Sequence, residues 1–298
     1  MSMLTQTRPS GIQEEITLRP GTLDDAVTIG QICHEAFTVF SAKHGFPSDF
    51  PTPEMGIGLA TMLLGHPGFS SVVAELEGRV VGSNFLDERS IIGGVGPITV
   101  SPAVQNLGVG RMLMQAVLNR ADARGKAGVR LLQAAYHGRS LSLYASLGFA
   151  VREPIACMQG APIGITIPGY TVRPATIDDL AACNQIARDV HGFDRATELE
   201  DALGQGSAVV VERNGCITGY ATSVAYFGHA VGETTEDIVA LIAAAPSFDG
   251  PGILIPIRNS GLFHWCLAHG LRVSFTMTLM STGLYNEPAG AFLPSVLY

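Results

Sequence analysis

GGVGPITVSPAVQNLGVGRMLMQAVLNRADARG, residues 93–125, is the stretch that decides the fold of this chain. Its apolar pattern changes period midway: residues 96–100 predict a buried strand, and the apolar residues after Gly110 recur at helical steps of three and four. A short glycine-containing loop joins the two. Because the first turn of a helix leaves backbone N–H groups unpaired and carries partial positive charge, the segment predicts a binding site for a polyphosphate.

Two common phosphate-binding motifs do not fit this stretch. A nucleoside-triphosphate loop requires GxxxxGK[ST], and the only two lysines of the chain, Lys43 and Lys126, stand in other settings. A dinucleotide fingerprint requires GxGxxG at the start of a helix, whereas Gly94 and Gly96 are followed by Pro97 and a strand. The sequence therefore disfavours both classes of nucleotide site.

A family resemblance accounts for the loop. QNLGVG, residues 105–110, resembles the Q/R-x-x-G-x-G/A loop of the GNAT superfamily of acyl-CoA-dependent N-acyltransferases. HGRSLSLYASLGF, residues 137–149, is similar to a second signature of that superfamily, N-x-x-A-x-x-[FLY]-Y-x-x-x-G-F. An apolar strand pattern, residues 129–135, lies between them. The matching positions of the second signature are Leu143, Tyr144, Gly148 and Phe149.

The resemblance covers residues 15 to about 160 and implies an α/β (α+β) fold. It implies a mixed, mostly antiparallel central sheet flanked by helices, in which strands four and five splay apart to receive the pantetheine arm of acetyl-CoA. The cofactor-binding residues that it implies are Ile98, Thr99, Val100, Gln105, Asn106, Leu107, Gly108, Val109, Gly110, Arg111, His137, Ser140 and Tyr144. His137 departs from the asparagine of the signature, so its contact with the cofactor stays open.

Tyr144 stands at the position of the superfamily's tyrosine, and we expect it to protonate the departing thiolate. A phenol of pKa about 10 is a suitable donor to a thiolate whose conjugate acid has a pKa of about 8.5. Burial as an ordinary core tyrosine is the alternative. For the general base the first candidates are Asp87 and Glu88, which follow the third strand close to the splay, and a chain of water molecules is the alternative.

The acceptor site is expected in residues 36–56, AFTVFSAKHGFPSDFPTPEMG, which are rich in aromatic residues, glycine and proline. The resemblance implies that this segment covers the acceptor. Alternatively, its phenylalanines fill the space under an irregular loop. The candidate substrate-binding residues are Phe40, His44, Phe46 and Phe50.

An internal repeat predicts two copies of the fold. ITLRPGTLDD, residues 16–25, matches YTVRPATIDD, residues 170–179, and each predicts a strand followed by a helix that a threonine caps. A hairpin recurs as well, with turns at Glu77-Gly78 and Asn214-Gly215. We expect a flexible N-terminal tail (1–14), a catalytic GNAT domain (15–160), a linker (161–169) and a degenerate GNAT-like domain (170–298).

The second copy lacks the features that would bind a cofactor. Its counterpart of the phosphate loop is AVGETTEDIVALI, residues 230–242, where Glu233, Glu236 and Asp237 would repel a pyrophosphate. Cys266 stands where the first copy has Tyr144. We therefore expect one acyl-CoA per chain.

Composition narrows the function classes further. The net charge of −8 argues against nucleic-acid partners and against an anionic membrane surface. Five cysteines without CxxC spacing indicate neither disulfides nor a zinc site, and we expect no metal cofactor. The sequence has neither an apolar signal segment nor an apolar run long enough to span a bilayer, so we expect a cytoplasmic protein, a monomer or homodimer.

These inferences lead to three hypotheses about function. The first is an N-acetyltransferase that transfers an acetyl group from acetyl-CoA to the primary amine of a small molecule by direct attack. The second is a non-catalytic acyl-CoA-binding sensor. The third is an acetyltransferase that acts on protein lysines.

Overall fold

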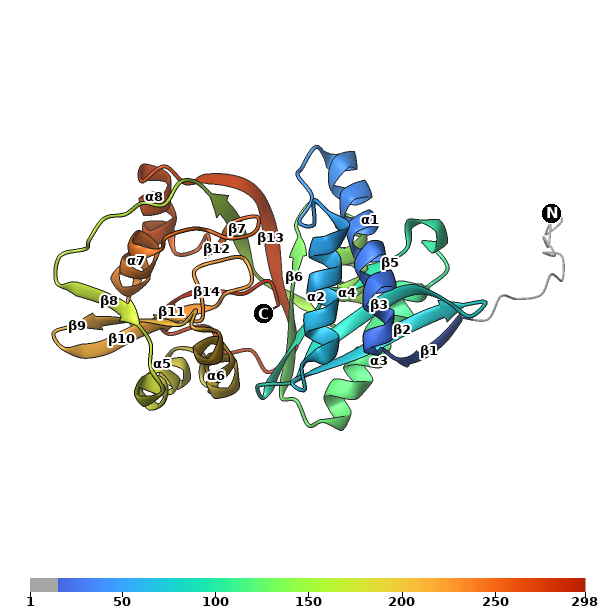
Figure 1. The fold of residues 1–298 in the computed structure, drawn as a ribbon, viewed down its shortest axis with the longest axis horizontal. Coiled ribbons are helices and arrows are strands. Elements are labelled where there is room, and N and C mark those ends of the chain that lie inside the picture. The colour runs from blue at the N-terminus through green and yellow to red at the C-terminus, as the bar shows by residue number, and fades with distance from the viewer. Residues whose placement is uncertain (1–15, 298) are drawn as a thin grey trace, which may run out of the picture.

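The computed structural model describes residues 16–297, drawn in Figure 1. The expected flexible tail, residues 1–14, lies outside the described residues. Within them, one sheet has nine strands and a second has five, and helices flank both sheets. Most strand pairs are antiparallel, and β4 with β6 is the parallel pair of the first sheet. This mixed architecture confirms the predicted fold class.

The first repeat begins with β1 (Ile16–Pro20) and continues through two helices, a hairpin and two further helices. Its elements after β1 are η1 (Leu23–Asp25), α1 (Ala26–His44), α2 (Pro53–Gly65), β2 (Phe69–Leu76), β3 (Arg79–Asp87), β4 (Ile92–Val95), β5 (Thr99–Val100), η2 (Pro102–Val104), α3 (Val109–Ala123), β6 (Gly128–Ala134), α4 (Gly138–Ser146) and β7 (Ala150–Gln159). The helix α3 confirms the one predicted from the opening stretch, and its apolar stripe is buried: Leu113, Met114, Val117 and Ala121.

The second repeat follows the same order from β8 (Tyr170–Pro174) onward. Its further elements are η3 (Ile177–Asp179), α5 (Leu180–His191), α6 (Ala196–Gln205), β9 (Val209–Arg213), β10 (Cys216–Ala221), β11 (Ala230–Gly232), α7 (Thr235–Ala244), β12 (Ile253–Pro256), α8 (Ser260–Ala268), β13 (Arg272–Gly283) and β14 (Ala291–Leu293). Between β11 and α7 there is no counterpart of the glycine loop that precedes α3, because only two residues separate these elements.

Matching contacts confirm the internal repeat. Arg19 donates from Nη1 to Oδ2 of Asp25 at 2.8 Å, and Arg173 donates in the same way to Asp179 at 2.7 Å. In each repeat the aspartate also takes part in a capping box that begins the first helix. The predicted hairpin turns have two consecutive residues of positive φ, with Asn214 at 53° and Gly215 at 77° in the second repeat.

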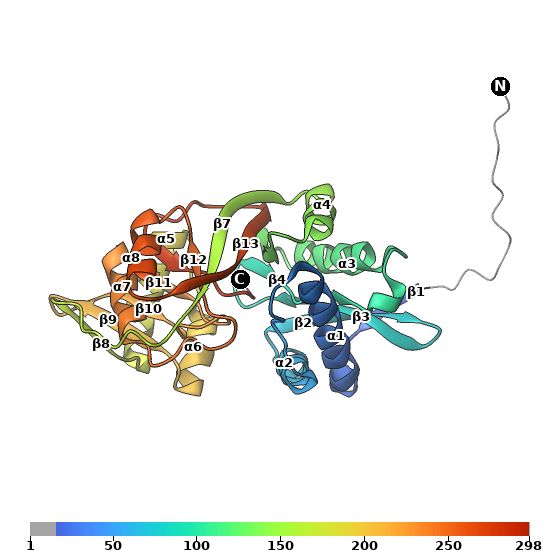
Figure 2. The same cartoon turned by 90° about the horizontal axis from the view of Figure 1, so that it is seen from above.

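The two repeats share strands. β13 of the second repeat lies between β6 and β7 of the first, and β7 lies between β13 and β12. β7 and β13 thus each pair with strands of the other repeat. Figure 2 shows β7 and β13 side by side where the two halves meet. The linker between the repeats, residues 161–169, therefore does not separate two independent sheets. The division into residues 15–160 and 170–298 stays a proposal that describes the repeats in the sequence.

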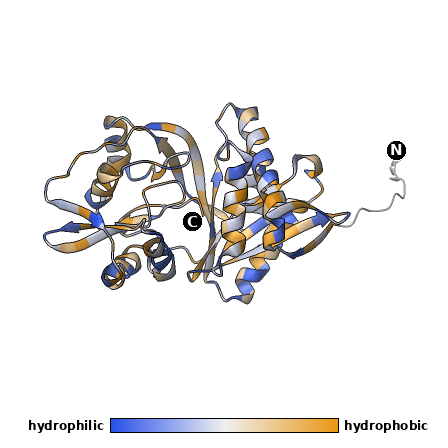
Figure 3. Cartoon of the chain, viewed as in Figure 1, coloured by the Kyte–Doolittle hydropathy of each residue, from blue (hydrophilic) through white to orange (hydrophobic). Residues whose placement is uncertain are grey.

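The helices α1 and α2 pack closely on one face of the first sheet. Gly30 and Gly56 lie at their contact, where a Cβ on either residue would collide with the backbone of the other helix. Figure 3 shows hydrophobic and hydrophilic residues alternating along both helices, as expected for helices with one buried face. Their close packing fixes the loop between them, residues 45–52, above the sheet.

A break in the first sheet opens the space for a ligand. β4 pairs with β6 only from Ile92 to Gly94, and residues 96–98 then leave the sheet, so the predicted continuous strand 96–100 is wrong in its first part. Pro97, which cannot donate to a ladder, lies at this interruption. β5 pairs with β3 alone, and no described strand covers its other edge. β5 and β6 consequently diverge, as the splay predicts.

Candidate active site

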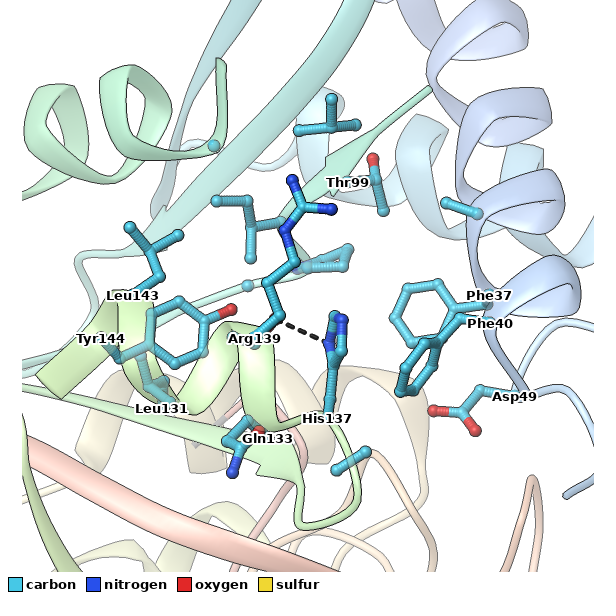
Figure 4. A pocket seen from close by; sticks show the side chains of 18 of the residues that line it. Phe37, Phe40, Asp49, Thr99, Leu131, Gln133, His137, Arg139, Leu143 and Tyr144 are labelled. Atoms are coloured by element: carbon cyan, nitrogen blue, oxygen red, sulfur yellow. Dashed lines mark hydrogen bonds between the residues drawn. The ribbon is translucent and has the colours of Figure 1, made fainter. Parts of the chain in front are cut away.

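A cavity of about 710 Å³ lies at the divergence of the strands. The edge of β5 and the loop before α3 form one part of its wall, and β6, α4 and α1 form the others. Figure 4 shows side chains entering from opposite sides, with Tyr144 and Leu131 facing Phe37 and Phe40 across the space. All the predicted cofactor-binding residues line this cavity except Leu107, which is 54% exposed outside it.

The loop before α3 presents the backbone of a helix N-terminus to the cavity. Gly108 is the N-cap residue and has a φ of 84°, and Asn106 has a φ of 77°. Gly108 takes this left-handed conformation without steric cost because it has no Cβ. At Gly110, a Cβ would lie 3.6 Å from the Leu143 side chain and 3.9 Å from that of Val100, both on the cavity wall. Small residues therefore keep the helix N-terminus open to a ligand.

Two arginines add positive charge at this end of the cavity. Arg111 donates to Ser146 Oγ at 2.6 Å, and Arg139 donates to Gln105 Oε1 at 3.4 Å. Neither guanidinium forms an ion pair with a carboxylate in the described part of the chain. In a protein of net charge −8, this end is thus suited to an anionic group such as a diphosphate.

Gln133 on β6 is a cavity residue that the sequence analysis missed. Its side chain is buried, and neither the amide nitrogen nor the oxygen has a hydrogen-bond partner within residues 16–297. An unsatisfied buried amide costs about 1–3 kcal/mol, so the site favours a ligand that satisfies it. A glutamine in the mostly apolar stretch 129–135 was the available signal. The amide groups of a pantetheine arm fit this position.

Tyr144 is both a core residue and a cavity residue. It is 6% exposed and packs with Leu131 and Phe149, and its surroundings raise the pKa of the phenol to about 12 through burial. Ser140, which also lines the cavity, has its Oγ 2.6 Å from Nδ1 of His137. Burial and the charge of Arg139 lower the pKa of His137 to about 4. At neutral pH the tyrosine therefore keeps its proton, and the hydrogen-bonded pair of Ser140 and a neutral imidazole lies in the same cavity.

Asp87 and Glu88 do not line the cavity, so their assignment as general bases is not supported. Asp87 accepts hydrogen bonds from the backbone N–H and the guanidinium of Arg89, and Glu88 pairs with Arg120 and Arg124. The carboxylate of Asp87 is thus occupied by Arg89 in the loop after β3, and that of Glu88 by the arginines at the end of α3. The sequence correctly predicted that both residues lie at the end of β3. The direction in which a side chain points beyond a strand end, however, cannot be predicted from its position in the sequence.

The substrate-binding candidates divide in two. Phe40, His44 and Phe50 line the cavity. Phe46 does not, because it stacks on Tyr136 at 4.4 Å and packs against Phe275 of β13. The alternative reading, in which a phenylalanine fills space under the loop, therefore holds for Phe46.

Asp49 and Tyr226 line the cavity although the sequence analysis named neither. Tyr226 comes from the second repeat, and its hydroxyl donates to Oδ2 of Asp49 at 2.9 Å. Burial raises the pKa of Asp49 to about 6. Asp49 was visible as a carboxylate inside an aromatic segment, whereas no local pattern connects Tyr226 with a site 177 residues away.

In the second repeat the corresponding space is filled. β14 pairs with the edge of β11, with Leu293 opposite Ala230, and also lies against β12. The start of α7 is capped internally, because Thr234 N donates to Asp237 Oδ2 at 2.8 Å. Asp237 is fully buried and also accepts from Thr218. At the position equivalent to the cavity, the described residues of this repeat therefore offer neither a free edge of β11 nor an open N-terminus of α7.

Two further features bear on the class of site. Within residues 16–297, no three or more histidine, cysteine, aspartate or glutamate side chains are grouped to hold a metal ion. In the same range, no helix combines the length and the apolar character needed to cross a membrane.

One protein-family model matches part of the chain. A sequence model of the acetyltransferase (GNAT) domain family matches residues 67–151, which run from just before β2 to the start of β7. This range contains the loop before α3, Gln133 and Tyr144. No curated protein sequence is significantly similar to the chain.

Solved structures match nine-tenths or more of the chain. An inferred acetyltransferase from Pyrococcus horikoshii is 17% identical with a TM-score of 0.72, over 97% of this chain and 98% of that one. A GCN5-related N-acetyltransferase from Sphaerobacter thermophilus is 16% identical with a TM-score of 0.60, over 91% and 96%. A tandem GNAT protein from the clavulanic acid biosynthesis pathway is 14% identical with a TM-score of 0.57, over 90% and 98%. At these identities the likeness concerns the fold, which is that of tandem GNAT proteins.

Proposed function

We propose that the chain, which matches the acetyltransferase (GNAT) domain model over residues 67–151, is an acyl-CoA-dependent acyltransferase that transfers an acetyl group from acetyl-CoA to the primary amine of a small molecule. One observation carries the proposal: a glycine-opened helix N-terminus and a buried tyrosine line the same cavity. The N-terminus of α3 would hold the diphosphate of the coenzyme, with Arg111 and Arg139 beside it. The free edge of β5 and the amide of Gln133 would hold the pantetheine arm.

The chemistry follows from this placement. A neutral amine attacks the thioester carbonyl carbon, the new C–N bond forms, and the C–S bond breaks. The leaving thiolate takes the proton of Tyr144, whose raised pKa ensures that it is protonated at neutral pH. The proton that the nitrogen loses restores the protonated Tyr144, and Ser140 and His137, which are hydrogen-bonded to each other in the same cavity, would relay it.

Direct attack is favoured over a covalent enzyme intermediate. No cysteine lines the cavity within residues 16–297. Cys33 and Cys157 are buried, and burial raises the pKa of both thiols far above the usual range. A nucleophilic cysteine requires the opposite, a lowered thiol pKa.

The second repeat favours a small acceptor over a protein lysine. The cavity wall is completed by residues of the second repeat, namely Tyr226, Phe227, Val296 and Leu297. A wall on that side leaves little room for a polypeptide to lie across the opening. The presence of Tyr144 with a proton path favours an enzyme over an acyl-CoA sensor.

The Tyr144→Phe variant tests the proposal. We expect turnover to fall about 100-fold, because the thiolate loses its proton donor, while the affinity for acetyl-CoA changes less than threefold. Thiol release with an amine panel measures the first quantity and titration calorimetry the second. Tyr170→Phe, at a partly exposed tyrosine of β8, is the matched control. Unchanged turnover would refute the role of Tyr144, and acetyl-CoA binding without thiol release for any amine would make the chain a sensor.

A further inference from the structure

The end of the cavity away from the phosphate loop has one carboxylate in an apolar setting. Asp49 lies in the loop between α1 and α2, is partly buried, and lines the cavity. The hydroxyl of Tyr226 donates to it at 2.9 Å. No lysine, arginine or histidine within residues 16–297 forms an ion pair with it. A buried carboxylate without a cationic partner is unfavourable, and a cationic ligand would relieve that cost.

The surroundings of Asp49 are aromatic. Phe37 and Phe50 pack edge to face at 5.0 Å, and Phe40 stacks on Tyr136 at 5.1 Å. All four rings line the same cavity, together with Phe227 of the second repeat. Aromatic faces attract both apolar groups and cations. This end thus presents apolar surface with a single anionic point.

The charges at this end also limit the acceptor. Asp49 is the only carboxylate among the described residues that line the cavity. A diamine or polyamine would therefore place a second ammonium against apolar rings. Lys43 and His44 lie in the exposed last turn of α1 at the rim, whereas the arginines that line the cavity, Arg111 and Arg139, belong to its phosphate end. The interior has no cation for an amino-acid carboxylate.

We propose that the acceptor is a primary monoamine with an apolar aryl or alkyl body, and that Asp49, held by Tyr226, binds its ammonium group and accepts its proton. The inference rests on the proposed acetyl transfer. Asp49 takes one proton from the ammonium, which leaves the neutral amine to attack. It then releases this proton to solvent, so the overall products are the amide, free coenzyme A and one proton. The second repeat thereby contributes directly to the acceptor site.

The pH dependence follows from the groups around Asp49. The titratable groups that interact with it are Tyr226, Tyr136, Cys33 and Cys157. Burial raises the pKa of all four, so they stay neutral through pH 8. Asp49 must be ionised to bind the ammonium, and its pKa is about 6. We expect kcat/KM for the amine to fall as the pH drops through about 6.

Steady-state kinetics on the full chain test the proposal. The panel is phenethylamine, hexylamine, phenylalanine, putrescine and a lysine-containing peptide, each with saturating acetyl-CoA. We expect kcat/KM for the first two to exceed the others at least tenfold. Asp49→Asn should lower kcat/KM for phenethylamine at least 100-fold and remove the acidic limb near pH 6. Tyr226→Phe should lower it about tenfold, and Asp178→Asn, at an exposed aspartate, should leave it unchanged.

The outcomes separate this inference from the proposed function. Preferred turnover of phenylalanine, putrescine or the peptide would overturn the inference and leave acetyl transfer standing. So would an Asp49→Asn variant that binds acetyl-CoA normally and retains wild-type kcat/KM. Thiol release with none of the amines, despite normal acetyl-CoA binding, would overturn both. A thermal melt and the acetyl-CoA affinity of each variant show whether it is folded.

Discussion

Three residues of the cavity show how burial shifts the pKa of an ionisable side chain, in a direction set by whether its charged form is the protonated or the deprotonated one. The charged forms of Tyr144, Asp49 and His137 are all disfavoured by desolvation. Burial therefore raises the pKa of Tyr144 to about 12 and of Asp49 to about 6, and lowers that of His137 to about 4. As a result, Tyr144 holds a proton at neutral pH and His137 is uncharged. Desolvation thus keeps Tyr144 protonated, as a proton donor, and His137 neutral, as a proton acceptor, in the same cavity.

A different residue, Asp25, tests the energetics of the repeat. The Arg19 guanidinium lowers the pKa of Asp25 to about 2 in the folded protein, against an ordinary 3.8. A lowered pKa stabilises the fold above about pH 4, and that contribution is lost as the pH falls towards 2. We expect Asp25→Asn to reduce the free energy of unfolding by about 2 kcal/mol at pH 7.

Urea unfolding at several pH values measures this effect, with Asp24→Asn at the exposed neighbouring position as the control. The difference between wild type and Asp25→Asn should shrink as the pH is lowered from 4 to 2. A difference that stays constant over that range would contradict the role of ionised Asp25.

Residue-scale prediction from the sequence depended on local motifs. Gly108 and Tyr144 stood in signatures, so their place in the cavity could be anticipated. Asp49 and Tyr226 meet only because the second repeat packs against the α1–α2 loop, a contact between segments 177 residues apart. Asp87 and Glu88 show the opposite failure, since a plausible sequence position did not determine which way their side chains point.

At the scale of elements, the site depends on the way α3 begins. The loop before it turns through left-handed residues at Asn106 and Gly108, and the open position at Gly110 lies in the first helical turn. The period change in the opening stretch predicted this strand, loop and helix. The break of the strand at residues 96–98 was not predicted, because Pro97 alone is compatible with either an edge strand or an interruption.

Gly110→Val tests the helix N-terminus without changing a left-handed residue. The added side chain would extend into the space beside Leu143 and Val100, where the coenzyme diphosphate is proposed to approach. We expect the Kd for acetyl-CoA, measured by calorimetry, to rise at least tenfold. Gly204→Val, in the exposed part of α6, is the control for the cost of valine in a helix. Equal affinities in both variants would place the diphosphate elsewhere.

At the scale of the whole molecule, the exchange of β7 and β13 joins strands of both repeats in one sheet. The internal repeat in the sequence predicted two copies of the fold. The loss of the phosphate loop from the second copy predicted a single cofactor site. Neither could predict the exchange, since a strand that pairs within its own repeat and one that pairs across have the same alternating pattern. β13 places Met277 on the cavity wall, so the exchange also builds the site.

Thermal unfolding tests this joint stability. Because the first sheet contains strands from both repeats, we expect a single calorimetric transition for the full chain, with acetyl-CoA raising its midpoint. Two separate transitions, of which acetyl-CoA shifts only one, would contradict a shared sheet as the stabilising unit.

The most direct test of the account is the stoichiometry of coenzyme binding. The first repeat has an open helix N-terminus beside a divergent strand, whereas β14 and Asp237 fill the equivalent space of the second. Titration calorimetry of the full chain with acetyl-CoA should therefore give one site per chain, weakened at least tenfold by Gly110→Val. Two sites, no binding heat at several temperatures, or one site that Gly110→Val leaves unchanged would contradict it.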